Sequence, residues 1–369
     1  MKTKVEIGDI IRAEKQAYLD TYRATPEQSK TLEALAQCRT EKMGSHVVEC
    51  DHCHYWQVRY NSCRNRHCPK CQGSKQAQWA LKLRDQLLPC RYFHIVFTVP
   101  CQLNGLIYSN QQTMYGILMQ SAPEALIKVS ANPKFLGAAT GCLSILHTWG
   151  QNLHFHPHVH MLVPAGGLSP DGWEWVESGR KFFVPVRVLS KIFRGIFVSK
   201  LQEACQSGQV KTTTDIEILK KQLYAMEWNV NSKKVFGGPG QVLTYLGRYT
   251  HKVAISNNRV LSYKDGKVSF RWKDYRQNHK PVKVMELNSL EFIRRFMLHV
   301  LPGNFYKIRY AGIFANKVRR EMLEKCRHLL ALLLGQELIM DVSICRGEKC
   351  PVCHTGNLVL AAVSSRPET

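Results

Sequence analysis

The sequence predicts an α+β fold, with a small cysteine-rich module, a larger region of strands and helices, and a helical end. Three observations predict it. Cysteine, histidine and arginine crowd residues 38–72, where aliphatic residues are few. Segments rich in β-branched and aromatic residues, such as YFHIVFTVP at 92–100, are typical of strands. Longer segments, for example around 111–130, have the composition of helices.

Local signals place the other elements along the chain. Apolar residues among many charges predict helices within 1–37 and over 76–88. The dipeptide Asp265-Gly266 predicts a tight turn, and with it a hairpin over 257–275. The remaining expected elements are a strand pair in 143–164, helices in 185–227, a Gly- and Pro-rich turn at 236–241, a helix over 242–253, and helices in 290–340.

Composition indicates a polyanionic partner, usually nucleic acid. The chain has 369 residues, with 51 Lys and Arg against 28 Asp and Glu, a formal net charge of +23. Such an excess favours nucleic acid, because neutralisation of phosphates by Lys and Arg drives binding. Residues 231–310 contain 16 Lys and Arg but 4 Asp and Glu. The net charge of this segment, 16 − 4 = +12, is just over half of the +23 of the whole chain. We expect this basic segment to follow a nucleic-acid backbone.

The same sequence excludes other classes of protein. Hydrophobic residues make up 44% of the chain, which excludes wholesale disorder. No apolar run reaches the roughly 18 residues of a membrane-spanning helix. The N-terminal residues lack the apolar core of a secretory signal. We therefore expect a cytoplasmic protein, whose 14 cysteines serve metal binding or catalysis rather than disulfides.

Two CxxC pairs predict a zinc module. Cys50-x2-Cys53 and Cys68-x2-Cys71 are separated by 14 residues. Each pair offers two thiolates from a tight turn, and Zn²⁺ prefers four such ligands in a tetrahedron. Further thiol and imidazole groups nearby leave a second ion open: Cys38 and His46 with Cys63 and His67.

Basic residues lie among these candidate ligands. Arg64, Arg66 and Lys70 would present positive charge to DNA phosphates from a rigid module, or form its solvated rim. A third CxxC, Cys350-Pro-Val-Cys353, lies near the C-terminus. The residues that could complete a site are spaced irregularly, so the sequence assigns no metal there and leaves the role of this pair open: Cys345, His354, Cys326 and His328.

A histidine-rich strand predicts a second metal site. His154, His156, His158 and His160 occupy alternate positions of HFHPHVH, and alternate residues of a strand share a face. His158 and His160 are close enough to bind one ion, and His156 is the local candidate for a third ligand. Imidazoles with an open coordination position suit Mn²⁺, Mg²⁺ or Zn²⁺.

Two tyrosines share a predicted helix face. Tyr245 and Tyr249 are four residues apart in YLGRYTHK, so their side chains would be neighbours on a helix. Arg248 and Lys252 add positive charge beside them. A tyrosine hydroxyl can attack a DNA phosphate and retain it as an ester, while a metal ion stabilises the developing charge. Two tyrosines allow one linkage for each strand transferred.

These motifs together resemble the two-tyrosine HUH rolling-circle transposases of the insertion-sequence-ninety-one family. His158-Val159-His160 is similar to the HUH motif (His, hydrophobic, His), and Tyr245-x3-Tyr249 to the tyrosine signature that follows it. Four longer blocks also resemble that family, in the expected order from about residue 38 to 316: NSCRNRHCPKCQ, HPHVHMLVPAGGL, YLGRYTHKVAISNNRV and HVLPGNFYKIRYAGIFAN.

The resemblance implies an HUH-type antiparallel sheet with flanking helices. Its expected boundaries are 1–90 for N-terminal helices and the zinc module, 91–300 for the HUH nuclease domain, and 301–369 for a helical, basic C-terminal region. It supports His158 and His160 as ligands of Mg²⁺ or Mn²⁺, and Tyr245 and Tyr249 as nucleophiles. The implied reaction is nicking and joining of single-stranded DNA at element ends through 5′-phosphotyrosine intermediates.

The resemblance also implies partners and alternatives. Expected partners are the single-stranded element ends and the target, near the bacterial nucleoid, with host machinery for unwinding, because no GKS or GKT phosphate loop appears. One alternative is an HUH replication initiator or relaxase. Others are a non-catalytic zinc DNA-binding regulator, which leaves the histidines and tyrosines unused, and a metal-dependent hydrolase that uses water.

Overall fold

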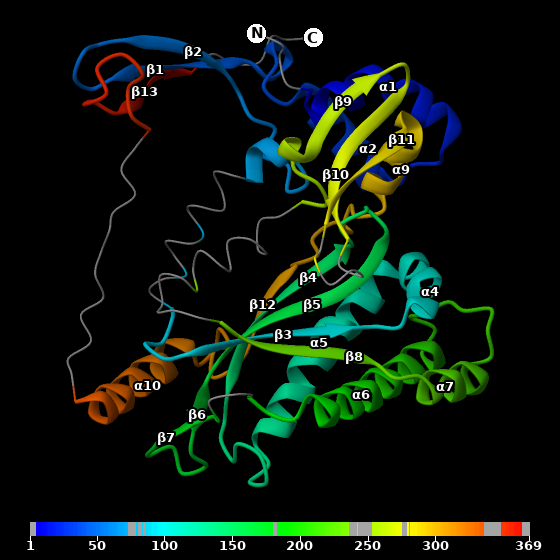
Figure 1. The fold of residues 1–369 in the computed structure, drawn as a ribbon, viewed down its shortest axis with the longest axis vertical. Coiled ribbons are helices and arrows are strands. Elements are labelled where there is room, and N and C mark those ends of the chain that lie inside the picture. Colours follow the sequence, from blue (N-terminus) through cyan, green and yellow to red (C-terminus); the bar gives the residue numbers. More distant parts are fainter. Residues whose placement is uncertain are drawn as a thin grey trace. The chain divides into compact units, whose positions relative to one another are not determined.

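The structure of the chain is a computed structural model that describes residues 5–72, 79, 83, 86–179, 183–235, 242, 253–274, 279, 281–335 and 348–363. It is a mixture of helices and antiparallel sheets, as the sequence predicts (Figure 1). The chain divides into two units that interleave in sequence. The first comprises Met1–Lys75, Ile255–Val300 and Ile339–Thr369, and the second comprises Gln76–Ala254 and Leu301–Leu338.

The first unit combines helices with two small antiparallel sheets. Helix α1 (Ile7–Thr21) packs against α2 (Pro26–Gln37), where Thr25 and Gln28 form a capping box. One sheet has the order β13-β1-β2 and the other β11-β10-β9. The bounds are β1 (Ser45–Cys50), β2 (Trp56–Tyr60), β9 (Val260–Lys264), β10 (Lys267–Lys273), β11 (Val282–Asn288), α9 (Ser289–Met297) and β13 (Leu358–Val363).

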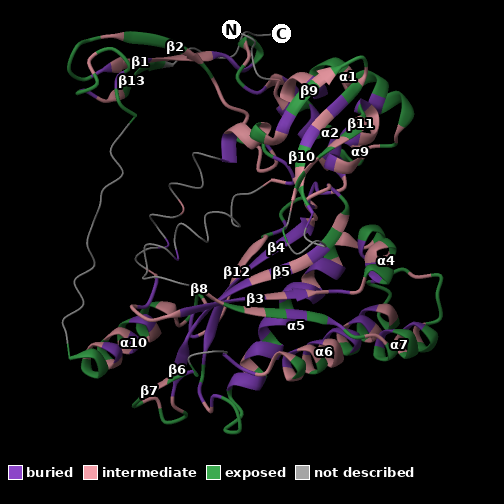
Figure 2. Ribbon diagram, in the orientation of Figure 1, coloured by how far each residue is buried: buried purple, intermediate pink, exposed green. Residues whose placement is uncertain are grey.

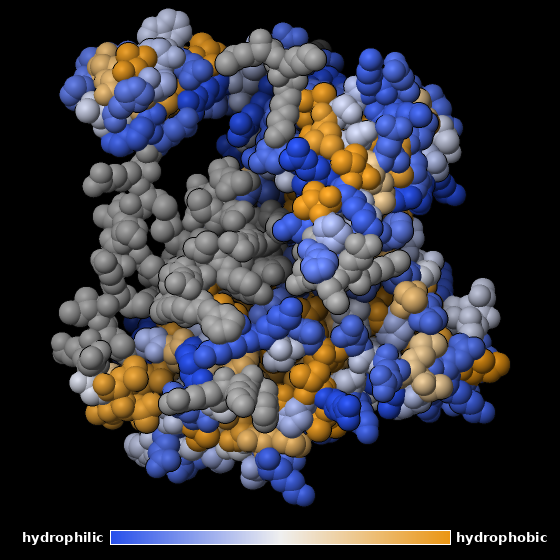
Figure 3. Space-filling model, in the orientation of Figure 1, coloured by the Kyte–Doolittle hydropathy of each residue, from blue (hydrophilic) through white to orange (hydrophobic). Residues whose placement is uncertain are grey.

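Local sequence explains these elements. The hairpin of β9 and β10 turns at Asp265 and Gly266, both with positive φ, as the sequence predicts. Helix α9 buries Phe292 and Phe296, one turn apart, and contacts α1. Strand β2 is an edge strand with large exposed side chains, including Trp56 and Val58. Apolar atoms are accordingly visible on the surface of this small sheet (Figure 3).

The second unit is built on a five-stranded antiparallel sheet of order β12-β4-β5-β3-β8. Helices α5 and α6 lie along one face of it (Figure 1). Its strands are β3 (Tyr92–Thr98), β4 (Gly141–Trp149), β5 (Phe155–Pro164), β8 (Asn229–Val235) and β12 (Ile308–Gly312). The other elements are α4 (Asn104–Ser109), α5 (Gln111–Ser130), β6 (Gly166–Leu168), β7 (Trp175–Glu177), α6 (Val186–Gln206), α7 (Ile216–Ala225) and α10 (Arg319–Leu334). Short 3-10 helices are η1 (Glu41–Met43), η2 (Cys101–Leu103) and η3 (Asn257–Arg259).

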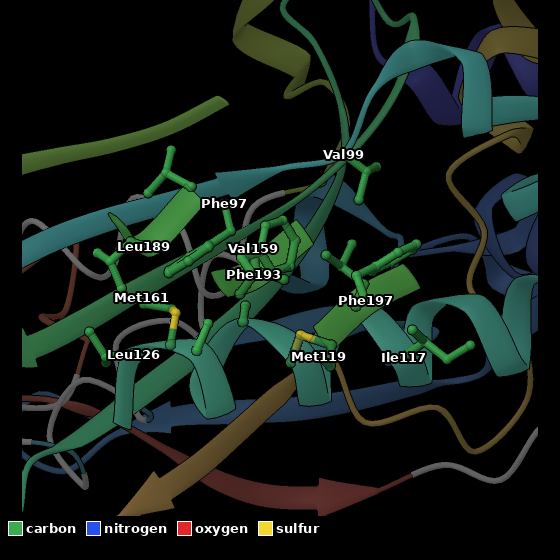
Figure 4. Packing of buried hydrophobic residues seen from close by; sticks show 14 of the residues in the cluster. Phe97, Val99, Ile117, Met119, Leu126, Val159, Met161, Leu189, Phe193 and Phe197 are labelled. Carbon is green, nitrogen blue, oxygen red and sulfur yellow. The ribbon is translucent and has the colours of Figure 1, made fainter. Parts of the chain in front are cut away.

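The main core lies between this sheet and α5 and α6. Phe97 of β3 and Val159 of β5 pack against Phe193 and Phe197 of α6, all fully buried (Figure 4). Strands β4 and β5 are buried along most of their length (Figure 2). Burial of such aromatic and branched side chains contributes about 1.5–3 kcal/mol each. Because this core covers one face of β5, the alternate residues of the strand lie on its other face.

A smaller cluster covers the opposite face of the sheet. Because alternate residues of a strand point to opposite sides, Leu143 and Ile145 face away from α5 and α6. Val242, three residues before the predicted nucleophile Tyr245, is fully buried in this cluster. The buried members are Leu83, Leu87, Tyr92, Leu143, Ile145, Leu162, Val235 and Val242.

The structure corrects one expectation about organisation. Residues 308–312 lie within a region predicted to be helical, but they form β12, because they extend the sheet by pairing with β4 from Ile145 to Gly141. The two units interleave in sequence because β13 returns to pair with β1 and α9 packs on α1. None of the described helices has the length and apolar character needed to span a membrane.

Candidate active site and metal centres

Three histidines from two paired strands meet on the face of the sheet opposite α5 and α6. His147 of β4 pairs with His158 of β5, and His160 lies two residues further along β5. One nitrogen from each ring lies within 4.8 Å of the others. His158 Nε2 and His160 Nε2 are 3.0 Å apart, which matches adjacent ligands at about 90° around an ion bound at about 2.1 Å. The donor set therefore fits a divalent ion.

Hydrogen bonds orient the two β5 imidazoles for this role. His158 Nδ1 donates to the carbonyl oxygen of His156 at 2.6 Å, so Nε2 carries the lone pair. His160 Nδ1 lies 2.7 Å from Nε2 of His94 on β3, and the two rings stack. Metal-binding histidines typically direct one nitrogen to the ion and the other to such a partner. His94 therefore orients the ring of His160.

Burial favours the neutral forms of His158 and His94. It lowers the pKa of His158 to about 3, helped by His156, and it lowers the pKa of His94 to about 4, helped by Lys233. A neutral imidazole offers the lone pair that a metal ion requires.

The metal-free protein should lose stability as the pH falls from 6.5 towards 4. Because the pKa of His94 is about 4 in the folded protein, below its ordinary value of 6.5, the unfolded chain binds more protons in this range. The contribution of neutral His94 to the free energy of unfolding is complete above pH 6.5. Below that pH it declines by up to about 1.4 kcal/mol per pH unit. Thermal unfolding with EDTA across this range should show a shallower decline for His94→Asn. If the stability of the unaltered protein and of His94→Asn fell equally with pH, His94 would not be the source of the pH dependence.

Among the described residues, the group of ring nitrogens that lie within 4.8 Å of one another contains His147, His158 and His160 but not His156, although the centroid of the His156 ring is 5.1 Å from that of His158. His156 side chain is exposed, and the strand pairing is irregular between His147 and Trp149, next to its position. His154 is also exposed and contacts Asn152. The backbone carbonyl of His156 accepts a hydrogen bond from His158 Nδ1.

The cysteines that the structure describes form two four-sulfur clusters, whereas the sequence predicted one site from both N-terminal CxxC pairs and left a second ion open. Cys68 and Cys71 meet Cys38 and Cys63, whereas Cys50 and Cys53 meet Cys350 and Cys353. Two CxxC turns can bind one ion only if their sulfur atoms lie close together. Here the two N-terminal turns do not meet each other, because the sulfurs of each turn lie beside two different cysteines. In the first cluster the sulfurs of Cys38 and Cys71 are 3.6 Å apart, and those of Cys38 and Cys68 are 3.5 Å apart.

The two histidines considered for a second zinc ion lie outside both clusters. His46 Nδ1 is 2.8 Å from the side-chain oxygen of Asn61. Among the described residues, His67 belongs to neither cysteine cluster. The first cluster offers four thiols and no open position, which is the donor set of a structural zinc site.

Loss of one thiol from the first cluster should remove one zinc ion per chain and destabilise the first unit. Cys68→Ser is expected to do so, because metal binding in such modules is coupled to folding. Cys205→Ser, in α6 and outside both clusters, is the matched control and should keep the full zinc content. Elemental analysis and thermal unfolding measure both effects, and unchanged zinc in Cys68→Ser would contradict this ligand set.

The basic residues predicted to contact DNA differ in their surroundings. Arg64 is exposed, with positive φ. Arg66 is partly buried, and burial lowers its pKa. Lys70 forms an ion pair with Glu6 at the start of α1. Arg64 is thus the exposed one of the three.

The tyrosine motif falls outside the described residues. This applies to Tyr245, Tyr249, Arg248 and Lys252, and also to Cys345. Sequence reasoning missed His147 and His94 because each stands alone in an apolar strand. The register of the strand pair could have identified His147, because a short turn after residue 149 brings it opposite His158.

Comparison with known proteins gives matches to two families. Residues 10–99 match the family described as "Transposase zinc-binding domain", and residues 141–322 match the family described as "Putative transposase". The first match contains both N-terminal CxxC pairs, and the second contains the three clustered histidines. No solved structure matches the chain.

Two curated relatives cover most of the chain. It is 41% identical to "Putative transposase y4qJ" of Sinorhizobium fredii, over 96% of this chain and 94% of the relative. It is 28% identical to "Transposase for insertion sequence element IS801" of Pseudomonas savastanoi pv. phaseolicola, over 82% of this chain and 74% of the relative.

Proposed function

This chain belongs to the IS91 family of transposases, and we propose that it nicks and joins single-stranded DNA at insertion-sequence ends by a rolling-circle route. The observation that supports this most is the cluster of His147, His158 and His160 on one sheet face. We propose that these residues hold Mg²⁺ or Mn²⁺, which polarises the scissile phosphate and stabilises its developing charge.

The position of Val242 supports Tyr245 and Tyr249 as nucleophiles. Val242 packs on the same sheet face as the histidine cluster, against Leu143, Ile145 and Leu162. In the helix that the sequence predicts over 242–253, positions 245 and 249 follow Val242 by three and seven residues. Residues at these spacings share one helix face, so we propose that both tyrosines act at the sheet face that carries the imidazoles.

The proposed step is a transesterification. The tyrosine hydroxyl oxygen attacks phosphorus, and the bond from phosphorus to the 3′ oxygen breaks. The phenol loses its proton, the departing oxygen gains one, and the products are a 5′-phosphotyrosine and a free 3′-OH. Attack by a 3′-OH on the ester reverses the step and joins strands, so the two tyrosines serve two linkages.

Basic residues near the cluster support a DNA backbone path. Lys233 of β8 lies opposite His94 of β3 and is close enough to affect its pKa. Strand β8 is the edge of the sheet, and Lys233 is exposed. We propose that phosphates approach the cluster along this edge, with unwinding of the duplex supplied by the host.

The test is a denaturing gel of the purified protein with labelled single-stranded oligonucleotides from both element ends. Reactions contain Mn²⁺ or Mg²⁺, and matched reactions contain EDTA. We expect a labelled band at the mass of the protein with metal and none with EDTA. An oligonucleotide of scrambled sequence should give no band.

Other outcomes would replace the proposal. Cleavage without an adduct would indicate a hydrolase that uses water. Binding to authentic ends without cleavage would indicate a non-catalytic regulator. Cleavage restricted to a plasmid origin would indicate a replication initiator or relaxase.

A further inference from the structure

The C-terminal CxxC meets the first N-terminal CxxC in the first unit. We infer that Cys50, Cys53, Cys350 and Cys353 bind a second zinc ion, which joins the C-terminal segment to the N-terminal zinc module. These four thiols lie outside the first cluster, and their sulfur atoms all lie within 4.8 Å of one another. The matched zinc-binding family covers residues 10–99, so it includes only half of this ligand set.

The two CxxC turns have the same local structure. Both sequences read C-x-x-C-H, and the histidine that follows, His54 or His354, has a positive φ of 59° or 58°. In each turn the histidine N–H donates to the carbonyl of the first cysteine, at 3.2 Å and 3.1 Å respectively. Two equivalent turns thus face each other across the four sulfurs.

Backbone amides in both turns also point at sulfur. The N–H of His52 lies 3.4 Å from Cys50 Sγ, and the N–H of Val352 lies 3.4 Å from Cys350 Sγ. The N–H of Gly356 is 3.3 Å from Cys353 Sγ. Hydrogen bonds of this kind stabilise the thiolate form, which is the form that binds zinc.

The sulfur separations match one shared ion. Cys50 and Cys353 have sulfurs 3.7 Å apart, and Cys53 and Cys350 have sulfurs 3.6 Å apart. Four sulfurs at about 2.3 Å from a tetrahedral zinc ion are about 3.8 Å from one another. All four cysteines are free. With four thiolates the coordination sphere is closed, so the ion is structural rather than catalytic.

Other contacts hold the two turns in register. The carboxylate of Asp51 accepts from the backbone N–H of Asn357 at 2.7 Å, and Arg59 forms a bidentate pair with Glu348. A Cβ atom at Gly356 would lie 2.4 Å from Cys50 Sγ, so this position requires glycine. Strand β13 then pairs with β1 from Leu358 onward. The second zinc site and the sheet β13-β1-β2 therefore form together.

The test is zinc stoichiometry of the full chain, purified without chelator. We expect two zinc ions per chain by elemental analysis, and one in the Cys350→Ser, Cys353→Ser variant. The matched control, Cys101→Ser with Cys205→Ser, removes two thiols outside both clusters and should retain two ions. Replacement of zinc by Co²⁺ should give sulfur-to-cobalt absorbance that falls by half in the first variant.

A second measurement on the unaltered protein separates ligand loss from misfolding. Cys53, although exposed, and Cys353 should resist iodoacetamide until a chelator is added, whereas exposed Cys101 should react at once. One zinc ion per chain would overturn the inference. Unchanged zinc in the double variant, labelling of Cys353 at the rate of Cys101, or iron in place of zinc would also overturn it.

Discussion

The Tyr245→Phe, Tyr249→Phe protein is expected to bind single-stranded element ends but to form no covalent adduct. Phenylalanine keeps the aromatic ring and removes only the hydroxyl that attacks phosphorus. Loss of a nucleophile should lower the rate of adduct formation by at least about 10³-fold. The denaturing gel measures the adduct, and a filter-binding or fluorescence assay measures DNA affinity at fixed salt.

A matched control uses a tyrosine that the structure places away from the histidines. Tyr224 of α7 is exposed, so Tyr224→Phe should form the adduct at the normal rate. Each single variant should retain one of the two linkages, and the oligonucleotide end that fails would show which tyrosine acts on it. An adduct in the double variant would disprove the nucleophile assignment.

The second large effect is expected at His147. His147→Ala should lower metal affinity and nicking by at least about 100-fold, because it removes one of three clustered imidazoles. DNA binding should persist, since the cluster is proposed to hold an ion rather than the backbone. Calorimetric titration with Mn²⁺ measures affinity, and the gel measures nicking.

His156→Ala is the matched control for this variant. Its backbone carbonyl, which accepts from His158 Nδ1, remains after the substitution, so metal affinity and nicking should change by less than about threefold. If His156→Ala were as defective as His147→Ala, the third ligand would be His156. Equal unfolding temperatures for both variants would exclude a general loss of folding.

Much of the second unit was predictable because its signals are local. The period of two in HFHPHVH predicts that His158 and His160 share one face, and their positions around buried Val159 agree with this. The strands at 92–98 and 141–164 and the helices at 111–130 and 186–225 follow from composition and apolar spacing. Strand β12 was missed because a five-residue strand at a sheet edge carries little periodic signal of its own.

The sequence by itself determined the residue types and the local geometry of each turn, strand and helix. It contained the CxxC turns, the histidine strand and the Asp265-Gly266 hairpin, since each depends on neighbours within a few residues. Only the tertiary structure decided which of these cysteines and histidines lie close together in space. Cys53 faces Cys350, 297 residues away, and His147 supplies the third imidazole from the adjacent strand. The physical reason is that metal ligands are selected by distance in space, which strand pairing and packing set and local periodicity does not.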